Sequence, residues 1–289
     1  MYFIDTHTHI YDSIFNEDID EVIERCKEKK VEKLVLPNED SKTIAALKGI
    51  VSRYKGICYG AVGLHPTSVK ADYEDELAVI KEELYANTSC YVAIGERGLD
   101  FYWDMTFQKE QETALKEQLN WARELNLPVI IHSRKAETHV LDILSSYKDV
   151  VAILHCWSGN EEETRRAIEY PNVYFGIGGT LTYKKSTIPS LIYIVGIERI
   201  VLETDSPYLT PMPFRGKRNE SSYIPLIANS LSDILNLPIE EISRVCSEKS
   251  KKTLNCFCVL VKRGFHFFCS FAWLEHKLLS LHRLKEKEK

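Results

Sequence analysis

The chain opens with a short apolar run that leads directly into polar side chains, Phe3-Ile4-Asp5-Thr6-His7-Thr8-His9. Alternate side chains of a β-strand point to the same face, so Asp5, His7 and His9 share one side of this stretch. Two imidazoles placed two residues apart can bind one metal ion. A single histidine is more often a hydrogen-bonded residue in a partly buried position, so this stretch alone leaves both interpretations open.

Further side chains of the kinds that bind metals stand at the ends of apolar, strand-like runs elsewhere in the chain: Glu96, His132, His155 and Asp205. Chance seldom places potential ligands at the same end of so many strands. The repeated position therefore favours a metal site built from the carboxyl ends of several strands.

Short apolar runs alternate with amphipathic helical periods along the chain, such as Val140, Ile143, Leu144 and Tyr147. We expect strands over residues 2–6, 33–36, 58–62, 91–95, 128–132, 151–155, 173–176 and 200–204. Apolar strands separated by helices are typical of a parallel sheet covered by helices. Eight such units in 289 residues predict an α/β fold, the closed (β/α)8 TIM barrel. An open doubly wound sheet with a dinucleotide site is less supported, because no Gly-rich loop follows an early strand. In a barrel, all strand ends meet at one mouth.

Composition and charge limit the class of protein. The apolar and charged fractions, 44% and 27%, are those of a soluble globular protein, and the formal charge of -5 gives no general attraction to nucleic acid. Eight cysteines without framework spacing indicate reduced thiols. A charged residue at position 5 argues against a signal or transit peptide, and no apolar run is long enough for a membrane span. We expect a cytoplasmic protein with no membrane contact and no obligate protein partner.

Seven motifs stand in a characteristic order along the chain: Asp5-Thr6-His7-Thr8-His9, Val62-Gly63-Leu64-His65-Pro66, Ile94 to Asp100, His132-Ser133-Arg134, His155-Cys156-Trp157-Ser158-Gly159, Leu202 to Pro207 and Arg215 to Glu220. Together they resemble the motifs of the TatD family of metal-dependent deoxyribonucleases. The resemblance covers residues 1–252 and implies one TIM-barrel hydrolase domain of the amidohydrolase type. It also implies metal-dependent hydrolysis of DNA phosphodiester bonds, typically from a 3′ end.

The resemblance implies six metal ligands around two ions that share Glu96: His7, His9, Glu96 and Asp205 around one, and Glu96, His132 and His155 around the other. Such oxygen and nitrogen ligands suit Mg²⁺ or Mn²⁺ and do not exclude Zn²⁺, and the family favours Mg²⁺. Two ions can clamp a phosphate and activate a water molecule. Glu96 and Asp205 are the predicted catalytic residues, with Asp205 placed to orient or deprotonate that water.

Other residues near the strand ends are predicted to contact the substrate: His65, Arg134, Trp157, Glu203, Arg215 and Arg218. The histidine and the arginines would meet phosphate, and the indole would stack on an unpaired base. Phe101, Tyr102 and Trp103 are further stacking candidates, although at least two of the four aromatic side chains are expected to pack under the loops. The expected substrate is DNA, at single-stranded or damaged 3′ ends.

For each of three side chains near the predicted mouth, two roles are possible. Asp5 either binds metal or orients a neighbouring histidine. Glu203 either meets a cation or histidine inside the barrel or helps to hold the substrate. Cys156 is a conceivable thiolate ligand, but strand alternation turns it away from the neighbouring His155, so we expect a buried core thiol.

Two features depart from the family pattern. Arg97 stands where related sequences usually have a bulky aliphatic residue, and alternation with Glu96 predicts that it points toward the helices as an unpaired cation. The other possibility is that it reaches the mouth and binds phosphate. Residues 253–289 form an atypical C-terminal extension, which is disordered, forms an extra helix around 272–284 or reflects an altered reading of the gene's end.

Activated water does not by itself distinguish phosphorus from carbon, so other functions stay open. A D-aminoacyl-tRNA deacylase or a small-molecule amidohydrolase would use the same metal site. A non-catalytic binding protein that retains only the barrel is a third possibility. The aromatic and basic residues in the loops favour nucleic acid, and therefore a 3′-5′ exodeoxyribonuclease.

Overall fold

The computed structural model describes residues 1–254, in which eight strands alternate with helices. The strands are β1 (Phe3–Asp5), β2 (Val31–Pro37), β3 (Cys58–Ala61), β4 (Tyr91–Asp100), β5 (Val129–Arg134), β6 (Ala152–Leu154), β7 (Val173–Ile177) and β8 (Ile200–Leu202). The α-helices are α1 (Ile19–Glu28), α2 (Ile44–Arg53), α3 (Tyr73–Ala86), α4 (Gln108–Leu125), α5 (Glu137–Leu144), α6 (Glu161–Ile168), α7 (Ile188–Val195), α8 (Ile224–Leu235) and α9 (Ile239–Thr253).

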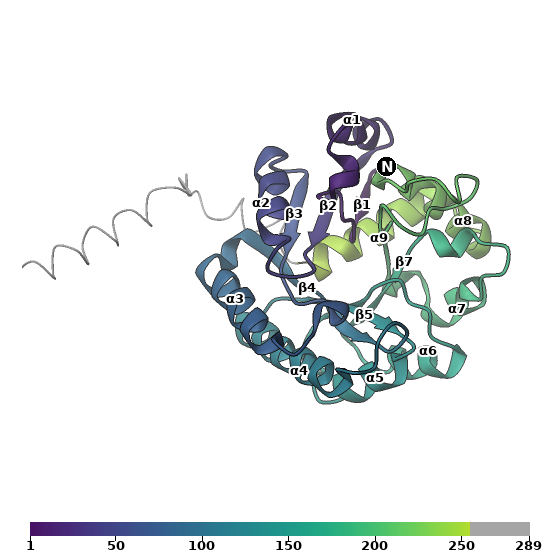
Figure 1. Ribbon diagram of the computed structural model, residues 1–289. Coiled ribbons are helices and arrows are strands. Elements are labelled where there is room, and N and C mark those ends of the chain that lie inside the picture. Colours follow the sequence, from purple (N-terminus) through teal and green to yellow (C-terminus); the bar gives the residue numbers. More distant parts are fainter. Residues whose placement is uncertain (255–289) are drawn as a thin grey trace, which may run out of the picture. The chain divides into compact units, whose positions relative to one another are not determined.

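The strands form one parallel sheet in which each strand pairs with its neighbours in the sequence, from β1 to β8. The first and last strands, β1 and β8, are joined by backbone hydrogen bonds at and beyond their carboxyl ends. The amide of Thr6 donates to the carbonyl of Leu202 at 3.0 Å, and the amide of Asp205 donates to that of His7 at 2.9 Å. The sheet is thereby a nearly closed barrel ringed by helices (Figure 1), and the predicted (β/α)8 TIM barrel is confirmed.

The two faces of the strands bury different sets of apolar side chains. Outward-facing residues such as Leu34, Ile131 and Phe175 pack with the helices in one continuous core. A smaller set alternates with them along the strands, is equally buried and points into the barrel: Ile4, Val35, Ala61, Ile130, Ile153 and Val201. The interior is therefore packed with apolar side chains below the strand ends, and polar residues are confined to the mouth.

Strand β4 is longer than the sequence predicts, because it continues past residue 95 to Asp100. Gly98 allows this continuation, since a Cβ at this position would collide with the backbone carbonyl of His132 on β5. The longer strand places both Glu96 and Asp100 on the inward-facing side of the sheet. At the start of α6, Asn160 and Glu163 form a capping box.

The predicted boundary at 252/253 lies at the end of α9. The predictions for the extension, including a helix around 272–284, fall on residues 255–289, which lie outside the described part of the chain. Within residues 1–254, no helix combines the length and the apolar character that crossing a membrane requires.

Candidate metal centre at the barrel mouth

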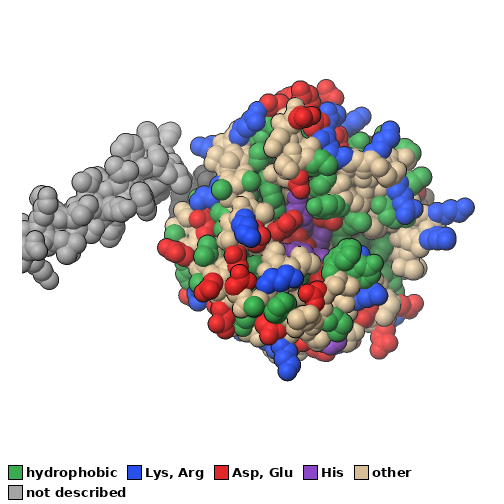
Figure 2. Space-filling model, viewed as in Figure 1, with side chains coloured by type: hydrophobic (Ala, Val, Ile, Leu, Met, Phe, Trp, Pro, Cys, Tyr) green, Lys and Arg blue, Asp and Glu red, His purple; other side chains and the backbone are tan. Residues whose placement is uncertain are grey.

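Polar side chains that follow or end six of the strands converge at the carboxyl end of the barrel: His7, His9, His65, Glu96, His132, His155 and Asp205. All six predicted metal ligands are in this group, together with His65. Figure 2 shows histidine side chains in the hollow at the centre of this face. The sequence prediction that these residues come together is confirmed, whereas their roles stay predictions.

The first set of ligand atoms surrounds one oxygen of Glu96. Nε2 of His7 lies 3.0 Å from Oε2 of Glu96 and 3.1 Å from Nε2 of His9. Oδ1 of Asp205 lies 3.4 Å from Nε2 of His9 and 3.7 Å from Nε2 of His7. Ligands about 2.1 Å from one ion are separated by about 3.0–3.4 Å in octahedral or tetrahedral geometry. The spacing and chemistry of these four atoms therefore fit a divalent cation.

The second set surrounds the other oxygen of Glu96. Oε1 lies 2.9 Å from Nδ1 of His132, 3.4 Å from Nε2 of His65 and 3.9 Å from Nε2 of His155. His155 stands between the two sets, because its Nε2 is also 3.5 Å from Oδ1 of Asp205 and its ring stacks on that of His7. The two oxygens of Glu96 thus face different groups of ligands, which is the arrangement of a bridging carboxylate.

The electrostatics of this centre favour positive charge between the ligands. Burial acts to raise the pKa of Glu96, but His7, His65 and His155 together hold that pKa well below its usual value. Burial acts to lower the pKa of His132, but Asp100 and Glu96 raise it to about 9. The Glu96 carboxylate is therefore ionised, and its environment attracts protons or metal ions.

Tyr11 holds His9 in one orientation, a role that no sequence pattern indicates. The Tyr11 hydroxyl donates to the carbonyl of Pro37 at 2.7 Å, so it accepts from Nδ1–H of His9 at 3.0 Å. The neutral ring then presents the lone pair of Nε2 to the first ligand set. This is the usual way in which a hydrogen bond behind a ligating histidine fixes its tautomer.

Asp100 plays the corresponding part for His132. Its Oδ2 lies 3.0 Å from Nε2 of His132, which leaves Nδ1 to face Glu96. Its Oδ1 accepts from the backbone amides of Tyr102 and Trp103, so the same carboxylate also holds the β4–α4 loop. The spacing of four residues from Glu96 is a signal for this role, but only if the strand is known to reach residue 100.

Asp5 supports the backbone of the mouth. It is fully buried, accepts from the amides of His7 and Thr204, and accepts from the Thr204 hydroxyl at 2.6 Å. Burial raises its pKa to about 7. Asp5 thus joins the ends of β1 and β8, and it positions the His7 backbone rather than an imidazole ring.

Glu203 meets a histidine, which was one of its two expected roles. Its side chain is fully buried, with Oε1 at 3.0 Å from Nδ1 of His155, although the approach is not aligned as a hydrogen bond. Oε1 also accepts from the amide of Cys156 at 2.5 Å, and the side chain occupies space left by Gly176. The prediction that Glu203 contacts substrate is therefore wrong, because a side chain at this depth cannot reach it.

Cys156 is not the buried core thiol that strand alternation predicts. β6 ends at Leu154, and Cys156 has a φ of 43°, which turns its half-buried side chain toward His155 and Glu203. Burial raises the pKa of this thiol, so it stays protonated near neutral pH. The alternation argument fails here because the residue lies beyond the strand.

The four aromatic candidates divide as expected, with two packed and two exposed. Trp157 is only 2% exposed and its indole donates to Thr164, and Phe101 is also buried. The prediction that Trp157 offers a face to a base is therefore wrong, because the ring packs under its loop. Tyr102 and Trp103 are exposed on the β4–α4 loop.

The three arginines that are predicted to bind phosphate make different kinds of contact. Arg134 is exposed and lies over the ring of Tyr102, 3.9 Å from its centroid, and Arg215 lies over the ring of Tyr183 at 4.5 Å. Arg218 instead makes two hydrogen bonds to Asp18 and one to the carbonyl of Ile14. The prediction that Arg218 binds phosphate is corrected, because its guanidinium anchors the β8–α8 loop.

Comparisons with known proteins agree with this fold and site. The family model described as TatD related DNase matches residues 4–255. The chain is 38% identical to the uncharacterized metal-dependent hydrolase YabD of Bacillus subtilis, over 86% of this chain and 97% of that protein. It is 33% identical to the 3′-5′ ssDNA/RNA exonuclease TatD of Cronobacter sakazakii, over 79% and 88%. The crystal structure of YjjV, a TatD homologue of Escherichia coli, aligns with a TM-score of 0.82 at 27% identity, over 88% and 98%.

Fold, ligand geometry and relatives define the class of protein, a metal-dependent hydrolase built on a TIM barrel. The family model spans nearly the whole described chain, and relatives above 30% identity cover most of it. The chain belongs to the TatD family.

Proposed function

We propose that this hydrolase cleaves phosphodiester bonds of DNA as a 3′-5′ exodeoxyribonuclease that acts on single-stranded or damaged ends. The observation that carries the proposal is the position of Glu96, whose two oxygens face two separate sets of nitrogen and oxygen ligands. Relatives at 33% and 30% identity are named 3′-5′ ssDNA/RNA exonuclease TatD, which supports the same chemistry.

The ligand sets suit two divalent ions that share Glu96. His7, His9 and Asp205 would hold the first ion with Oε2 of Glu96, and His132 and His155 the second with Oε1. We infer Mg²⁺ from the family resemblance, with Mn²⁺ and Zn²⁺ as alternatives, because a ligand set of oxygen and nitrogen is compatible with all three. Two bound ions supply the charge that clamps a phosphate and lowers the pKa of a water molecule.

Asp205 would orient the attacking water. It is the most exposed of the three carboxylates that lie within 4 Å of His155, with 15% of its side chain accessible, whereas Glu96 and Glu203 are buried. Burial acts to raise the pKa of Asp205, but His155 and His9 hold it below its usual value, so the group is an ionised acceptor. A carboxylate that accepts from the water fixes the direction of attack.

The residues around the mouth favour a nucleic acid over a small molecule. Arg134 lies beside His132 and is held on the ring of Tyr102, so its charge is presented at the mouth for phosphate. His65 reaches the second ligand set from beyond the end of β3, on the other side of β4 from His132. On the other side of the centre, the half-exposed ring of Tyr208 lies 6.1 Å from that of His9. Cations and exposed aromatic rings in this combination match the phosphates and bases of a single strand.

The test is digestion of single-stranded DNA labelled at either end, with and without Mg²⁺ or Mn²⁺. We expect metal-dependent release of nucleotides from the 3′ end, and a loss of about 10²–10³-fold in the Asp205→Asn variant. Charged D-aminoacyl-tRNA is assayed in parallel. Deacylation of the tRNA without any cleavage of DNA would overturn the proposal in favour of the deacylase.

A further inference from the structure

A pocket of about 320 Å³ opens beside the metal centre, between the short helix Pro66–Ser68 and the β4–α4 loop. We propose that it binds the base of the nucleotide on the His132 side of the scissile phosphate. This inference rests on the proposed nuclease function and assigns the residues that recognise the substrate. Binding pockets for small ligands measure about 300–1,000 Å³, so this one has room for a single small ring system.

The pocket is joined to the metal centre through two of its walls. Thr67 places its hydroxyl 2.6 Å from Nδ1 of His65, whose Nε2 faces Glu96. Asp100 contacts Nε2 of His132 from the other wall. A group in the pocket is therefore separated from the second ligand set only by side chains that contact it, Thr67 on one wall and Asp100 on the other.

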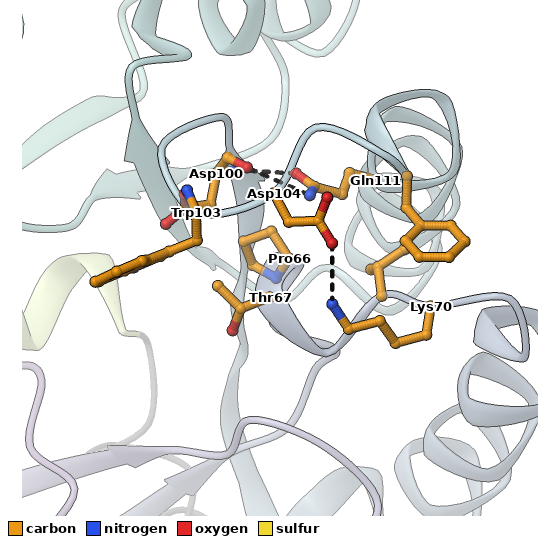
Figure 3. A pocket seen from close by; sticks show the side chains of 9 residues that line it. Pro66, Thr67, Lys70, Asp100, Trp103, Asp104 and Gln111 are labelled. Atoms are coloured by element: carbon orange, nitrogen blue, oxygen red, sulfur yellow. Dashed lines mark hydrogen bonds and ion pairs between the residues drawn. The ribbon is translucent and has the colours of Figure 1, made fainter.

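The walls suit a flat group with apolar faces and a polar edge. Pro66, Val69, Trp103 and Phe107 supply the apolar surface. Figure 3 shows Pro66 and Thr67 between Trp103 on one side and Lys70 on the other. Trp103 is 68% exposed, the most open tryptophan of the described residues, and its ring is available for stacking.

Two charged side chains at the rim of the pocket can exchange their mutual ion pair for contacts with a bound base. Lys70 and Asp104 form an ion pair at 3.6 Å, and about half of each side chain is exposed. Exposed pairs of this kind contribute little to stability, so either group can bind the edge of a base instead. Asp100 meanwhile holds the backbone amides of Tyr102 and Trp103, so the loop that carries the stacking ring is fixed in advance.

The experiment compares a ten-residue thymidine strand with two versions that lack either the terminal or the penultimate base at the 3′ end. The metal-loaded wild type is expected to lose between about 5-fold and 150-fold in kcat/KM for one of the two abasic strands, the range for one stacked base. Trp103→Ala is expected to lose a similar factor on the intact strand and no more on the abasic one. Thermal unfolding checks that the variant is folded.

Tyr193→Ala is the matched control. Tyr193 is equally exposed, and its hydroxyl bonds the carbonyl of Ile234 near the end of α8, on the face of the barrel away from the mouth. The Tyr193→Ala variant should lose the same factor in kcat/KM on the abasic strand as the wild type does. A second readout is intrinsic fluorescence, which thymidine 5′-monophosphate should quench in the wild type and much less in Trp103→Ala.

The outcomes separate the two proposals. Equal cleavage of all three strands by the wild type, or full base dependence in Trp103→Ala, would overturn the pocket while the nuclease function stands. A wild type that cleaves none of the strands with any divalent metal overturns the nuclease function and the pocket with it.

Discussion

Glu96 and Arg97 are consecutive residues of β4, and both are buried charges, but they face opposite sides of the sheet. Glu96 points into the mouth, where five histidines lie within 4 Å of its oxygens. Arg97 pairs in register with Ile131, whose side chain lies in the helix-facing core. None of the three guanidinium nitrogens has a hydrogen-bond partner among residues 1–254.

The contrast shows why a buried charge is useful on one face and costly on the other. The mouth collects the ends of all strands, so ligands from distant parts of the chain can surround one carboxylate. The space between sheet and helices is lined by apolar side chains, which supply neither a hydrogen-bond acceptor nor a negative charge for a cation. Burial alone lowers the pKa of Arg97 to about 9, and no neighbour opposes the effect. The prediction that Arg97 points toward the helices as an unpaired cation is confirmed.

The largest expected effect comes from removing the charge at the mouth. Glu96→Gln should reduce the metal-dependent activity by about 10³-fold or more, because one neutral amide replaces the carboxylate whose two oxygens face the two ligand sets. A saturating divalent metal should raise the melting temperature of the wild type, by mass action, and have little effect on the variant. Both are measured on the same preparations.

Glu83→Gln provides the control for this substitution. Glu83 is a mostly buried carboxylate on α3, paired with Lys48 and Tyr91. Its loss should lower the stability slightly and leave the activity and the metal-induced stabilisation intact. If Glu96→Gln kept a normal metal response, Glu96 would not be the bridging ligand.

A smaller effect of opposite sign is expected on the other face of the strand. Arg97→Ile should raise the free energy of unfolding by about 1–4 kcal/mol, because a buried cation without a partner is replaced by an apolar side chain. In a domain of this size each kcal/mol corresponds to about 2–4 °C in melting temperature. Since the pKa in the folded state is lowered to about 9, the cost of the charge is fully present below pH 9 and declines above it.

Arg165→Ile is the control for a change of the same type at the surface. Arg165 is exposed on α6 and pairs with Glu161, so its loss should cost only a few tenths of a kcal/mol. An unchanged melting temperature in Arg97→Ile, together with weaker binding of DNA, would mean that Arg97 reaches the substrate after all.

The barrel, and the gathering of the candidate ligands at its mouth, were predictable from the sequence because both follow from regular alternation. Apolar runs ending in histidine or a carboxylate mark the ends of parallel strands, and strand ends of a barrel must meet. Even the outward direction of Arg97 follows from its position next to Glu96. These inferences depend only on the period of the strand and the closure of the sheet.

The errors lie where the chain leaves a strand. Cys156 follows the end of β6 and turns by a positive φ, so alternation no longer applies to it. Trp157 and Arg218 are in loops, and their burial and ion pairing depend on Thr164 and Asp18, which are distant in space until the loops fold. The hydrogen-bond partners of His9 and His132 were missed for the same reason. A hydrogen bond between Tyr11 and His9 depends on the path of the loop after β1.

That missed partner gives the smallest of the effects expected at the mouth. Tyr11→Phe removes the acceptor for Nδ1–H of His9 but keeps the ring, so His9 can still bind metal in a less fixed orientation. The metal concentration for half-maximal activity should rise by about 10–100-fold, with little change in kcat at saturating metal. Tyr91→Phe, which loses a hydrogen bond to Glu83 far from the mouth, should cost about 1 kcal/mol of stability and leave the metal response unchanged. A fall in kcat that saturating metal does not restore would show that Tyr11 acts on the substrate rather than through His9.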